Sequence, residues 1–289
     1  MRYYTIITDS SCDLPASLAE KLGIRVVPLS VFVEGKQYYN YLDGRDISNE
    51  EFYGQLVQGK MVTTSAVNVE QFKMVMESEL LTGHDVLYIG FSSGLSGTYN
   101  AGRMAAEELR EEYPNSTVLT VDSLCASLGQ GMLVYQAALQ KAGGKTIEEV
   151  HAFCEETKLK VAHWFTVDDL HQLKRGGRIS GATALIGTML NIKPVLHVDN
   201  EGKLINMSKA RGRNGAIQAL VDRMEKTAVE PEKQTIFISH GNCYDEAKKL
   251  AELVHERFGC KSVINFVGPT IGAHSGQGTL ALFYIGTER

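Results

Sequence analysis

The chain has 289 residues, of which 44% are hydrophobic and 22% are charged, so it can bury a sizeable core and is not a disordered chain. Its formal net charge is −5, from 29 basic and 34 acidic residues, which argues against a protein that binds nucleic-acid backbones in general. At roughly 150 residues per domain, the length predicts two domains or one large α/β unit.

Cysteine usage and apolar runs indicate the cellular compartment. The five cysteines are an odd number and include no C-x-x-C pair, so neither a disulfide framework nor a structural zinc site is expected. The N-terminus is too polar for a secretion signal, and the longest apolar runs, such as 280–285, are far shorter than the roughly 20 residues of a membrane span. We therefore expect a cytoplasmic protein that would handle any lipid as a soluble carrier.

In the first half of the chain, apolar strand-like runs alternate with helix-like periodicity. Strands are expected at 3–8, 25–33, 86–91 and 117–121. Helices are expected at 16–22, 69–79, 98–113 and 129–142. Pro28 inside the second run indicates an edge strand or a bulge, because proline has no N–H for the strand ladder. The alternation predicts a mainly parallel sheet with helices on both faces.

The second half of the chain combines this alternation with a hairpin. Strands are expected at 161–167, 194–198, 203–208, 235–239, 262–267 and 279–285. Helices are expected at 168–174, 182–190, 214–226 and 246–258. The turn Asp199-Asn200-Glu201-Gly202 predicts a β-hairpin, and therefore a mixed sheet in this half. The boundary is expected near 155–162, which gives one α/β domain at 1–158 and a second, mixed α/β domain at 159–289.

The segment 91–98 (FSSGLSGT) is the first candidate site. It follows one predicted strand and opens a predicted helix, so its hydroxyls and backbone N–H groups lie at a helix N-terminus, on the sheet edge where α/β proteins bind ligands. A carboxylate or a phosphate suits that arrangement. The alternative is a plain capped turn with Ser96 or Thr98 as N-cap. The segment lacks the Gly-Lys-Ser/Thr ending of a P-loop, and Thr98 replaces the last glycine of a G-x-S-x-G nucleophile elbow.

Two further segments offer neutral polar groups. Residues 62–68 (VTTSAVN) place three hydroxyls before a predicted helix, where they are either ligand donors or an ordinary capping segment. Residues 267–278 (VGPTIGAHSGQG) read as a glycine-rich loop between two strands, which lets the backbone approach a ligand closely. His274 in this loop either donates a hydrogen bond to an anion or is a structural histidine.

The charged clusters have functional and structural interpretations. In 173–180 (LKRGGRIS) three cations flank a glycine pair at a helix end, where they either complement the helix dipole or dock an acidic partner. Lys209, Arg211 and Arg213 form a second basic cluster. Asp9 and Asp13, within 8–15 (TDSSCDLP), are candidate acids or metal ligands, but aspartates in such turns usually satisfy backbone N–H groups. No further ligand stands at a suitable spacing, so we assign no metal.

Taken together, these segments resemble the DegV family of bacterial fatty-acid-binding proteins, the FakB-like subunits. Six motifs carry the resemblance, and they run in order from the first strand to the last: TDSSCDLP at 8–15, TTS at 63–65, FSSGLSGTYN at 91–100, LKRGGRIS at 173–180, LNIKPVLHVDNEGKL at 190–204 and GPTIGAHSGQGTLALFY at 268–284. Each motif is short, and their order and completeness make the match specific.

The resemblance implies two α/β domains with a long-chain fatty acid in a tunnel between them, and no cofactor, catalytic residue or nucleic-acid partner. By motif, the carboxylate would be held by Thr64 or its neighbour Thr63, by Ser96 and Ser93, and by His274. The apolar helix at 182–190, with Leu185, Ile186 and Met189, is a candidate wall for the acyl chain, or plain core.

The family also implies a partner. A separate ATP-binding fatty acid kinase subunit phosphorylates the carried acid, and the acyl-phosphate enters phospholipid synthesis, which leaves room for transient membrane contact. Arg175, Arg178 and Arg211 fall where a surface for docking that kinase is expected.

Two other functions remain as alternatives. A serine esterase-like hydrolase would use Ser96 and His274, with Asp9 or Asp122 orienting the imidazole, although the altered elbow argues against it. A regulatory or DNA-associated protein is disfavoured by the acidic charge and by the lack of a helix-turn-helix pattern.

Overall fold

The computed structural model describes residues 3–179 and 191–289. The N-terminal half is built on a four-stranded sheet in the order β2-β1-β6-β7, in which every pairing is parallel. Its strands are β1 (Tyr4–Asp9), β2 (Arg25–Val27), β6 (Asp85–Gly90) and β7 (Val118–Asp122). This confirms the parallel sheet expected from the sequence.

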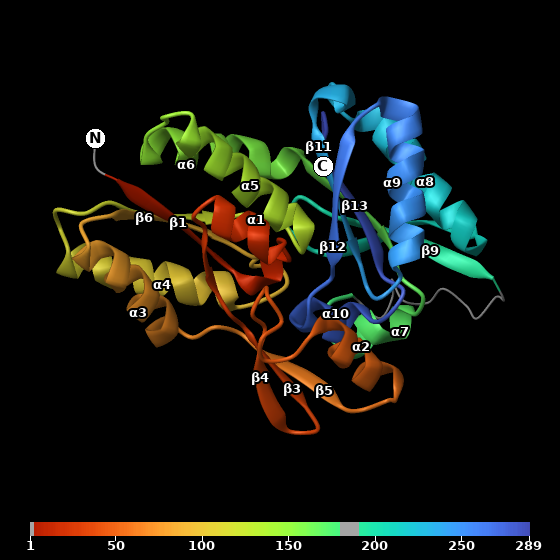
Figure 1. Ribbon diagram of the computed structural model, residues 1–289, viewed down its shortest axis with the longest axis horizontal. Helices are drawn as coiled ribbons and strands as arrows, with labels where there is room; N and C mark the ends of the chain where they lie inside the picture. The colour runs from red at the N-terminus through yellow and green to blue at the C-terminus, as the bar shows by residue number, and fades with distance from the viewer. Residues whose placement is uncertain (1–2, 180–190) are drawn as a thin grey trace.

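Helices cover both faces of this sheet, as predicted. Figure 1 shows α3 and α4 on one side of β1 and β6, and α5 and α6 on the other. The helices of this half are α1 (Ala16–Lys21), α2 (Asn49–Val57), α3 (Val69–Leu81), α4 (Thr98–Glu112), α5 (Leu128–Ala142) and α6 (Ile147–Thr157). A short 3-10 turn, η1 (Ser10–Cys12), follows β1.

A small antiparallel sheet in the order β4-β3-β5 was not expected from the sequence. It consists of β3 (Ser30–Val33), β4 (Lys36–Tyr39) and β5 (Val62–Ser65). The single strand predicted at 25–33 was therefore wrong. Pro28 lies between β2 and β3, which belong to different sheets, because proline cannot continue the backbone ladder. The segment 62–65, for which the sequence left ligand donors and a helix cap as alternatives, forms the edge strand β5.

The C-terminal half contains a six-stranded mixed sheet in the order β10-β9-β8-β13-β11-β12. Only β11 and β12 pair in parallel. The strands are β8 (Val161–Thr166), β9 (Ile192–Val198), β10 (Leu204–Arg211), β11 (Thr235–His240), β12 (Lys261–Phe266) and β13 (Leu280–Ile285). The predicted hairpin is confirmed as β9–β10.

The helices of this half include one that the sequence did not reveal. They are α7 (Leu170–Arg175), α8 (Gly212–Thr227), α9 (Tyr244–Phe258) and α10 (Pro269–Ser275), with 3-10 turns η2 (Lys158–Lys160) and η3 (Pro231–Lys233). The segment 267–278 is thus not the open loop expected from its glycines, because Pro269 starts the helix α10. The helix predicted at 182–190 lies outside the described residues.

Helix α5 joins the two sheets through one apolar core. Its Met132 and Leu133 belong to the same buried cluster as Leu87 of the parallel sheet and Phe237 and Phe283 of the mixed sheet. Helices α8 and α9 cover the opposite face of the mixed sheet with a second cluster. The N-terminus of α5 therefore lies where the two halves meet.

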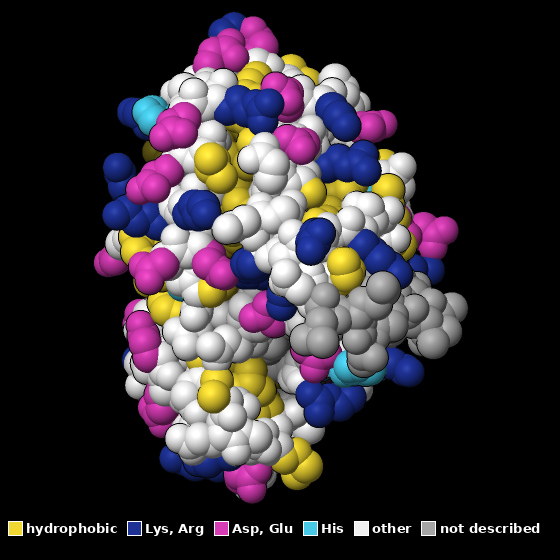
Figure 2. Space-filling model, turned by 90° about the vertical axis from the view of Figure 1, so that its right-hand side faces the viewer, with side chains coloured by type: hydrophobic (Ala, Val, Ile, Leu, Met, Phe, Trp, Pro, Cys, Tyr) yellow, Lys and Arg dark blue, Asp and Glu magenta, His cyan; other side chains and the backbone are white. Residues whose placement is uncertain are grey.

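The helices and the surface charges both bear on the class of protein. No helix among residues 3–179 and 191–289 is long and apolar enough to cross a membrane. On the face shown in Figure 2, Lys and Arg side chains are interspersed with Asp and Glu side chains over the described part of the chain. This mixed pattern differs from the basic face of proteins that grip nucleic-acid backbones.

Gly129 lets α5 approach the mixed sheet. A Cβ at this position would lie 2.1 Å from Nε2 of His163, whose ring is fully buried on β8. We predict that Gly129→Ala destabilises the protein by about 2 kcal/mol or more, because the ring has no room to move. Gly54→Ala in α2 is the matched control: nothing lies within 4 Å of its Cβ, so the change should stabilise by roughly 0.5–1 kcal/mol. Urea unfolding measures both, and equal stability of the two variants would contradict the expectation.

Candidate ligand-binding site

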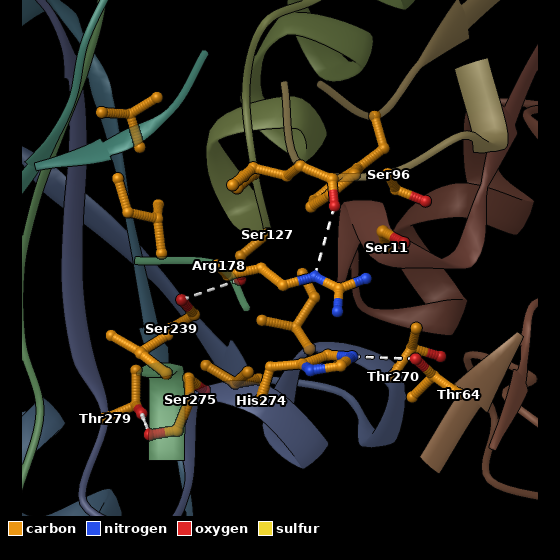
Figure 3. Close-up of a pocket in the computed structure, with 18 of the residues that line it drawn as sticks. Ser11, Thr64, Ser96, Ser127, Arg178, Ser239, Thr270, His274, Ser275 and Thr279 are labelled. Carbon is orange, nitrogen blue, oxygen red and sulfur yellow. Dashed lines mark hydrogen bonds between the residues drawn. The ribbon is translucent and has the colours of Figure 1, made fainter. Parts of the chain in front are cut away.

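A pocket opens between the two halves, beside the N-terminus of α5 (Figure 3). Its cavity measures about 210 Å³. The lining comes from β5, the loop before α4, the start of α5, α10 and one face of the mixed sheet. Segments far apart in the sequence therefore contribute to a single site.

The floor of the pocket is one face of the mixed sheet. Phe165, Ala281 and Phe283 line it, together with Val198 and Leu204 of the hairpin. Alternation along each strand explains this set, because residues two apart point to the same face, and Ala281 pairs directly with Phe165. The floor is therefore mostly apolar.

Thr64 and His274 meet on one side of the pocket. The Thr64 hydroxyl lies 2.8 Å from Nε2 of His274, which stands in the last turn of α10. Burial, with a smaller contribution from the charge of Arg178, lowers the pKa of His274 to about 4, so the ring is neutral at pH 7. Thr63 alternates to the other face of β5, is exposed, and does not line the pocket. Of the two predicted threonines, the structure brings only Thr64 to the site.

Ser96 lies in the pocket wall, and Ser93 does not. The Ser96 hydroxyl accepts a hydrogen bond from the backbone N–H of Thr98 at 3.2 Å and lies 2.9 Å from the Thr98 hydroxyl, at the start of α4. Ser93 is exposed, and its backbone N–H donates to Asp122 at 3.2 Å. The Ser92 hydroxyl donates to the carbonyl of Gly202 at 2.8 Å, so the hairpin tip of the other half fixes this loop.

Arg178, predicted for a docking surface, lines the pocket. Its side chain is partly buried, its Nε donates to the carbonyl of Leu95 at 3.3 Å, and burial lowers its pKa. Figure 3 shows the guanidinium directed into the pocket between Ser96 and His274. Gly176 leaves room for the neighbouring His274 ring, because a Cβ at this position would lie 2.4 Å from Nδ1 of His274.

The other two predicted docking cations are exposed. Arg175 and Arg211 both lie at the surface, at the ends of α7 and β10. Arg213 belongs to the same predicted cluster as Arg211 but differs from it. Its side chain is only 15% exposed, and it pairs with Glu246 at 2.6 Å. Sequence alone could not separate the paired arginine from its exposed neighbour.

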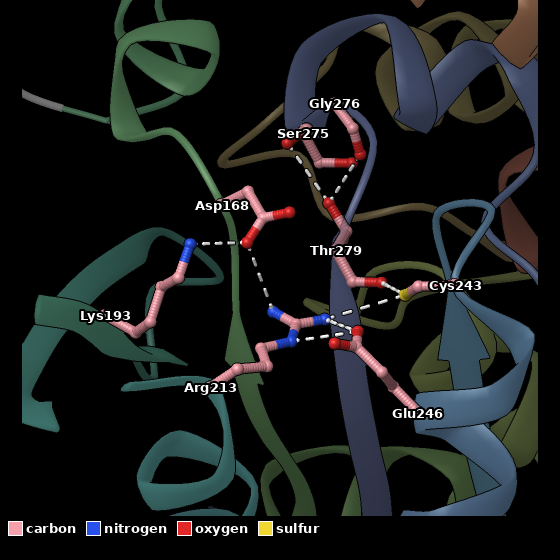
Figure 4. A network of polar contacts seen from close by, with 8 residues as sticks. All are labelled: Asp168, Lys193, Arg213, Cys243, Glu246, Ser275, Gly276 and Thr279. Atoms are coloured by element: carbon pink, nitrogen blue, oxygen red, sulfur yellow. Dashed lines mark hydrogen bonds and ion pairs between the residues drawn. The ribbon is translucent and has the colours of Figure 1, made fainter. Parts of the chain in front are cut away.

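The Arg213 pair belongs to a network that fixes the end of α10 (Figure 4). Asp168 accepts from Lys193 at 2.6 Å and faces Arg213 at 3.9 Å. The Thr279 hydroxyl donates to the carbonyls of Ser275 and Gly276 at 3.1 and 2.8 Å. These last two bonds satisfy carbonyls that the helix end leaves free, and so hold the turn after His274.

The pocket wall contains a buried chain of polar groups that was not predicted from the sequence. The Ser127 hydroxyl lies 2.5 Å from Oδ2 of Asp13 and 3.0 Å from the Ser239 hydroxyl. Asp13 also accepts from the backbone N–H of Gly268 at 3.0 Å. Burial raises the pKa of Asp13 to about 8, although the hydrogen bonds from Ser127 and Gly268 act to lower it. Ser127 and Ser239 stand in no sequence motif, so only the fold could bring them together.

The residues of the alternative hydrolase do not form a bonded triad. Ser96 pairs with Thr98, and His274 pairs with Thr64. Asp9 is buried and accepts from the backbone N–H groups of Ser11 and Phe91, both at 3.0 Å. Asp122 similarly accepts backbone N–H groups of neighbouring turns. Within residues 3–179 and 191–289, no group of three His, Cys, Asp or Glu side chains could hold a metal ion.

The fold and the pocket define an α/β protein of two packed halves with an apolar-floored, polar-walled cavity between them. A family model described as "Uncharacterised protein, DegV family" matches residues 4–287, and the chain therefore belongs to the DegV family. A DegV domain-containing protein of Clostridium perfringens is 44% identical over 100% of this chain and 99% of its own length.

Two solved structures are similar over almost the whole chain. A DegV family protein of Thermus thermophilus, described as fatty acid binding, is 32% identical with a TM-score of 0.86 and covers 99% of this chain and 100% of its own. A stearic acid-binding protein of Eubacterium ventriosum is 25% identical with a TM-score of 0.87 and covers 98% of each chain.

The Asp13 carboxyl gives a pH-dependent prediction. Its pKa is raised in the folded state from 3.8 to about 8, so the folded chain keeps a proton that the unfolded chain releases above about pH 4. The stability that Asp13 contributes is thus fully present below pH 4 and is lost as the pH rises through 8, by at most about 1.4 kcal/mol per pH unit. In Asp13→Asn, the amide can donate to Ser127 and accept from Gly268 as the protonated acid does.

We therefore expect Asp13→Asn to gain stability relative to the natural chain as the pH rises from 5 to 8. Denaturant unfolding at both pH values measures the difference. The exposed Asp245→Asn is the matched control and should show no such trend. A stability difference between Asp13→Asn and the natural chain that is constant over this range would contradict the protonated state.

Proposed function

We propose that this protein binds one long-chain fatty acid in the pocket between its halves. The observation that carries the proposal is the division of the pocket into an apolar floor and a wall that bears Thr64, Ser96, His274 and Arg178. A ligand with a long apolar chain and one anionic end matches that division. The fatty-acid-binding relatives with the same fold support this ligand class.

The wall supplies what a buried carboxylate needs. Taking a carboxylate out of water is costly unless hydrogen bonds and an opposite charge replace the water. The hydroxyls of Thr64 and Ser96 offer neutral donors, and the Arg178 guanidinium offers the charge. Partial burial lowers the pKa of Arg178, so the cation is less well solvated there than in water and an anion beside it would be stabilised.

The floor supplies most of the affinity in this proposal. Burial of one CH₂ group contributes about 0.8 kcal/mol, so a chain of 15 or so carbons contributes around 10 kcal/mol before the cost of ordering it. The acyl chain would run over Phe165, Ala281 and Phe283 in a tunnel between the halves.

We further propose that the protein acts with a separate fatty acid kinase that phosphorylates the bound carboxylate for phospholipid synthesis. Two observations support a carrier over an enzyme: Ser96 and His274 are each paired elsewhere, and the loop 91–98 lacks the lysine of a phosphate-binding loop. The exposed Arg175 and Arg211 are the proposed docking cations, whereas Arg178 would face the ligand. Their acidic counterpart would lie on the kinase.

The first test is the content of the purified protein. We expect organic extraction followed by mass spectrometry to yield a long-chain fatty acid in a molar ratio near one to the protein. Titration of the delipidated protein with stearate or oleate gives the affinity. A protein that contains no fatty acid and also fails to bind either one refutes the proposal.

Thr64 and Thr63 form a matched pair for the carboxylate site. Thr64→Val removes the hydroxyl that faces His274, and should weaken stearate binding by about 1–3 kcal/mol, or roughly 5- to 150-fold in Kd. Thr63→Val changes the neighbouring residue on the outer face of the same strand and should leave Kd unchanged. Isothermal titration measures both variants. Equal losses would show that the effect comes from β5 itself and not from the Thr64 hydroxyl.

A further inference from the structure

The apolar floor of the pocket carries one hydroxyl that the carboxylate site does not use. Ser239 stands on β11 directly opposite Ala281 of β13, so its side chain points to the same face as the apolar residues of the floor. It is 0% exposed. Figure 3 shows it on the opposite side of the pocket from Thr64 and Ser96. A buried hydroxyl at this place requires an explanation, because apolar packing alone would favour alanine or valine.

The hydrogen bonds of Ser239 leave part of its capacity free. A hydroxyl donates once and accepts up to twice. Within the described residues, the Ser239 hydroxyl has one partner, the Ser127 hydroxyl at 3.0 Å, and Ser127 in turn contacts Asp13. When Asp13 is protonated, it donates to Ser127, and Ser127 donates to Ser239. The proton of the Ser239 hydroxyl is then free to bond a ligand. When Asp13 is ionised, Ser239 donates to Ser127, and Ser127 donates to Asp13. A lone pair of Ser239 is then free to accept from a ligand.

A second buried hydroxyl in the pocket wall has no partner. Ser275, at the end of α10, is 5% exposed, and its Oγ makes no hydrogen bond among the described residues. It lines the pocket, and Figure 3 shows it on the same side as Ser239. A buried hydroxyl without a partner costs about 1–3 kcal/mol, so a ligand that supplies one is favoured.

The chemistry of this end of the pocket selects a neutral polar group. Asp13 lies behind Ser127. A ligand carboxylate placed here would lie near either the negative charge of ionised Asp13 or its buried, protonated form. A ligand hydroxyl avoids that cost. It both donates and accepts, so it satisfies Ser239 in either direction of the chain.

We propose that Ser239, oriented by Ser127, binds a hydroxyl group on the acyl chain, so that the pocket takes hydroxylated long-chain fatty acids as well as plain ones. This inference rests on the proposed fatty-acid site, and it adds a second point of recognition at the far side of the same cavity. Ser275 provides a further buried hydroxyl for the same part of the ligand. The carboxylate end stays at Thr64, Ser96 and Arg178.

The experiment compares stearate with hydroxystearates that carry the hydroxyl at carbon 2, 3, 10 or 12. Isothermal titration of the delipidated full chain gives Kd for each acid, and the readout is the ratio of the stearate Kd to the hydroxystearate Kd. We expect Ser239→Ala to lower this ratio at least fivefold for the isomer that the natural chain prefers. A smaller fall for every isomer overturns the inference.

Controls separate this inference from the proposal on which it rests. Ser262→Ala, on β12 and outside the pocket, removes another buried hydroxyl that has no partner among the described residues, and should leave every ratio unchanged. If Ser239→Ala does not fold, Ser239→Cys, which keeps the size and weakens the donor, is measured against the same criterion. A natural chain that binds neither stearate nor any isomer refutes the fatty-acid site itself. Stearate binding with ratios that Ser239→Ala does not change refutes only the role of Ser239.

Discussion

The contact between Thr64 and His274 defines the site, because it joins two residues that are 210 positions apart. Thr64 belongs to the small sheet of the N-terminal half, and His274 belongs to a helix of the C-terminal half. The contact forms where α10 packs directly on the small sheet and on α2, since Ala273 of α10 belongs to one buried cluster with Val31 of β3 and Phe52 of α2. A ligand that bridges this pocket would therefore bind the folded arrangement and stabilise it.

Close approaches at glycine make this packing possible. Gly176 lies against the ring of His274, and Gly129 lies against the ring of His163. In both places a Cβ would overlap the imidazole, so the two rings keep fixed positions. His163 also donates from Nδ1 to the carbonyl of Val161 and accepts from the N–H of Ala126, at 2.7 and 3.2 Å. Both ring nitrogens of His163 are thus paired with backbone groups, so it is a structural histidine although it also lines the pocket, whereas Nε2 of His274 faces the Thr64 hydroxyl.

Sequence patterns predicted the parallel sheet and the Ser96 loop because both depend on local signals. The strand, the Ser-Gly loop and the helix around Ser96 follow directly in the chain, and alternation gives the helices on both faces. The choice between Thr64 and Thr63 depended on which face of β5 meets α10, and that is a tertiary fact. The helix α10 was missed because its glycines resemble a loop, although Pro269 at its first turn is a usual helix start.

The far side of the pocket could not be predicted for a different reason. Ser127 adopts a φ of 53°, a left-handed conformation that favours glycine, and no residue pattern announces it at a serine. Asp13, Ser127 and Ser239 come from three separate regions, and each is unremarkable alone. Likewise, nothing in LKRGGRIS distinguishes the exposed Arg175 from Arg178, because the difference depends on the turn at Gly176-Gly177 that sends one side chain inward.

The charges around the cavity determine the orientation in which an amphipathic ligand would bind. The Arg178 guanidinium lines one side, between Ser96 and His274, and the Asp13 carboxyl lies behind Ser127 on the other. His274 is neutral at pH 7, so Arg178 is the positive group of the wall among the described residues. A carboxylate is attracted toward Arg178 and repelled from Asp13 whenever that acid ionises, and the reduced dielectric of a partly enclosed pocket strengthens both effects. An amphipathic ligand would thus bind in one orientation, because reversing it would place the anion beside an acid and the apolar chain against the partly buried cation of Arg178.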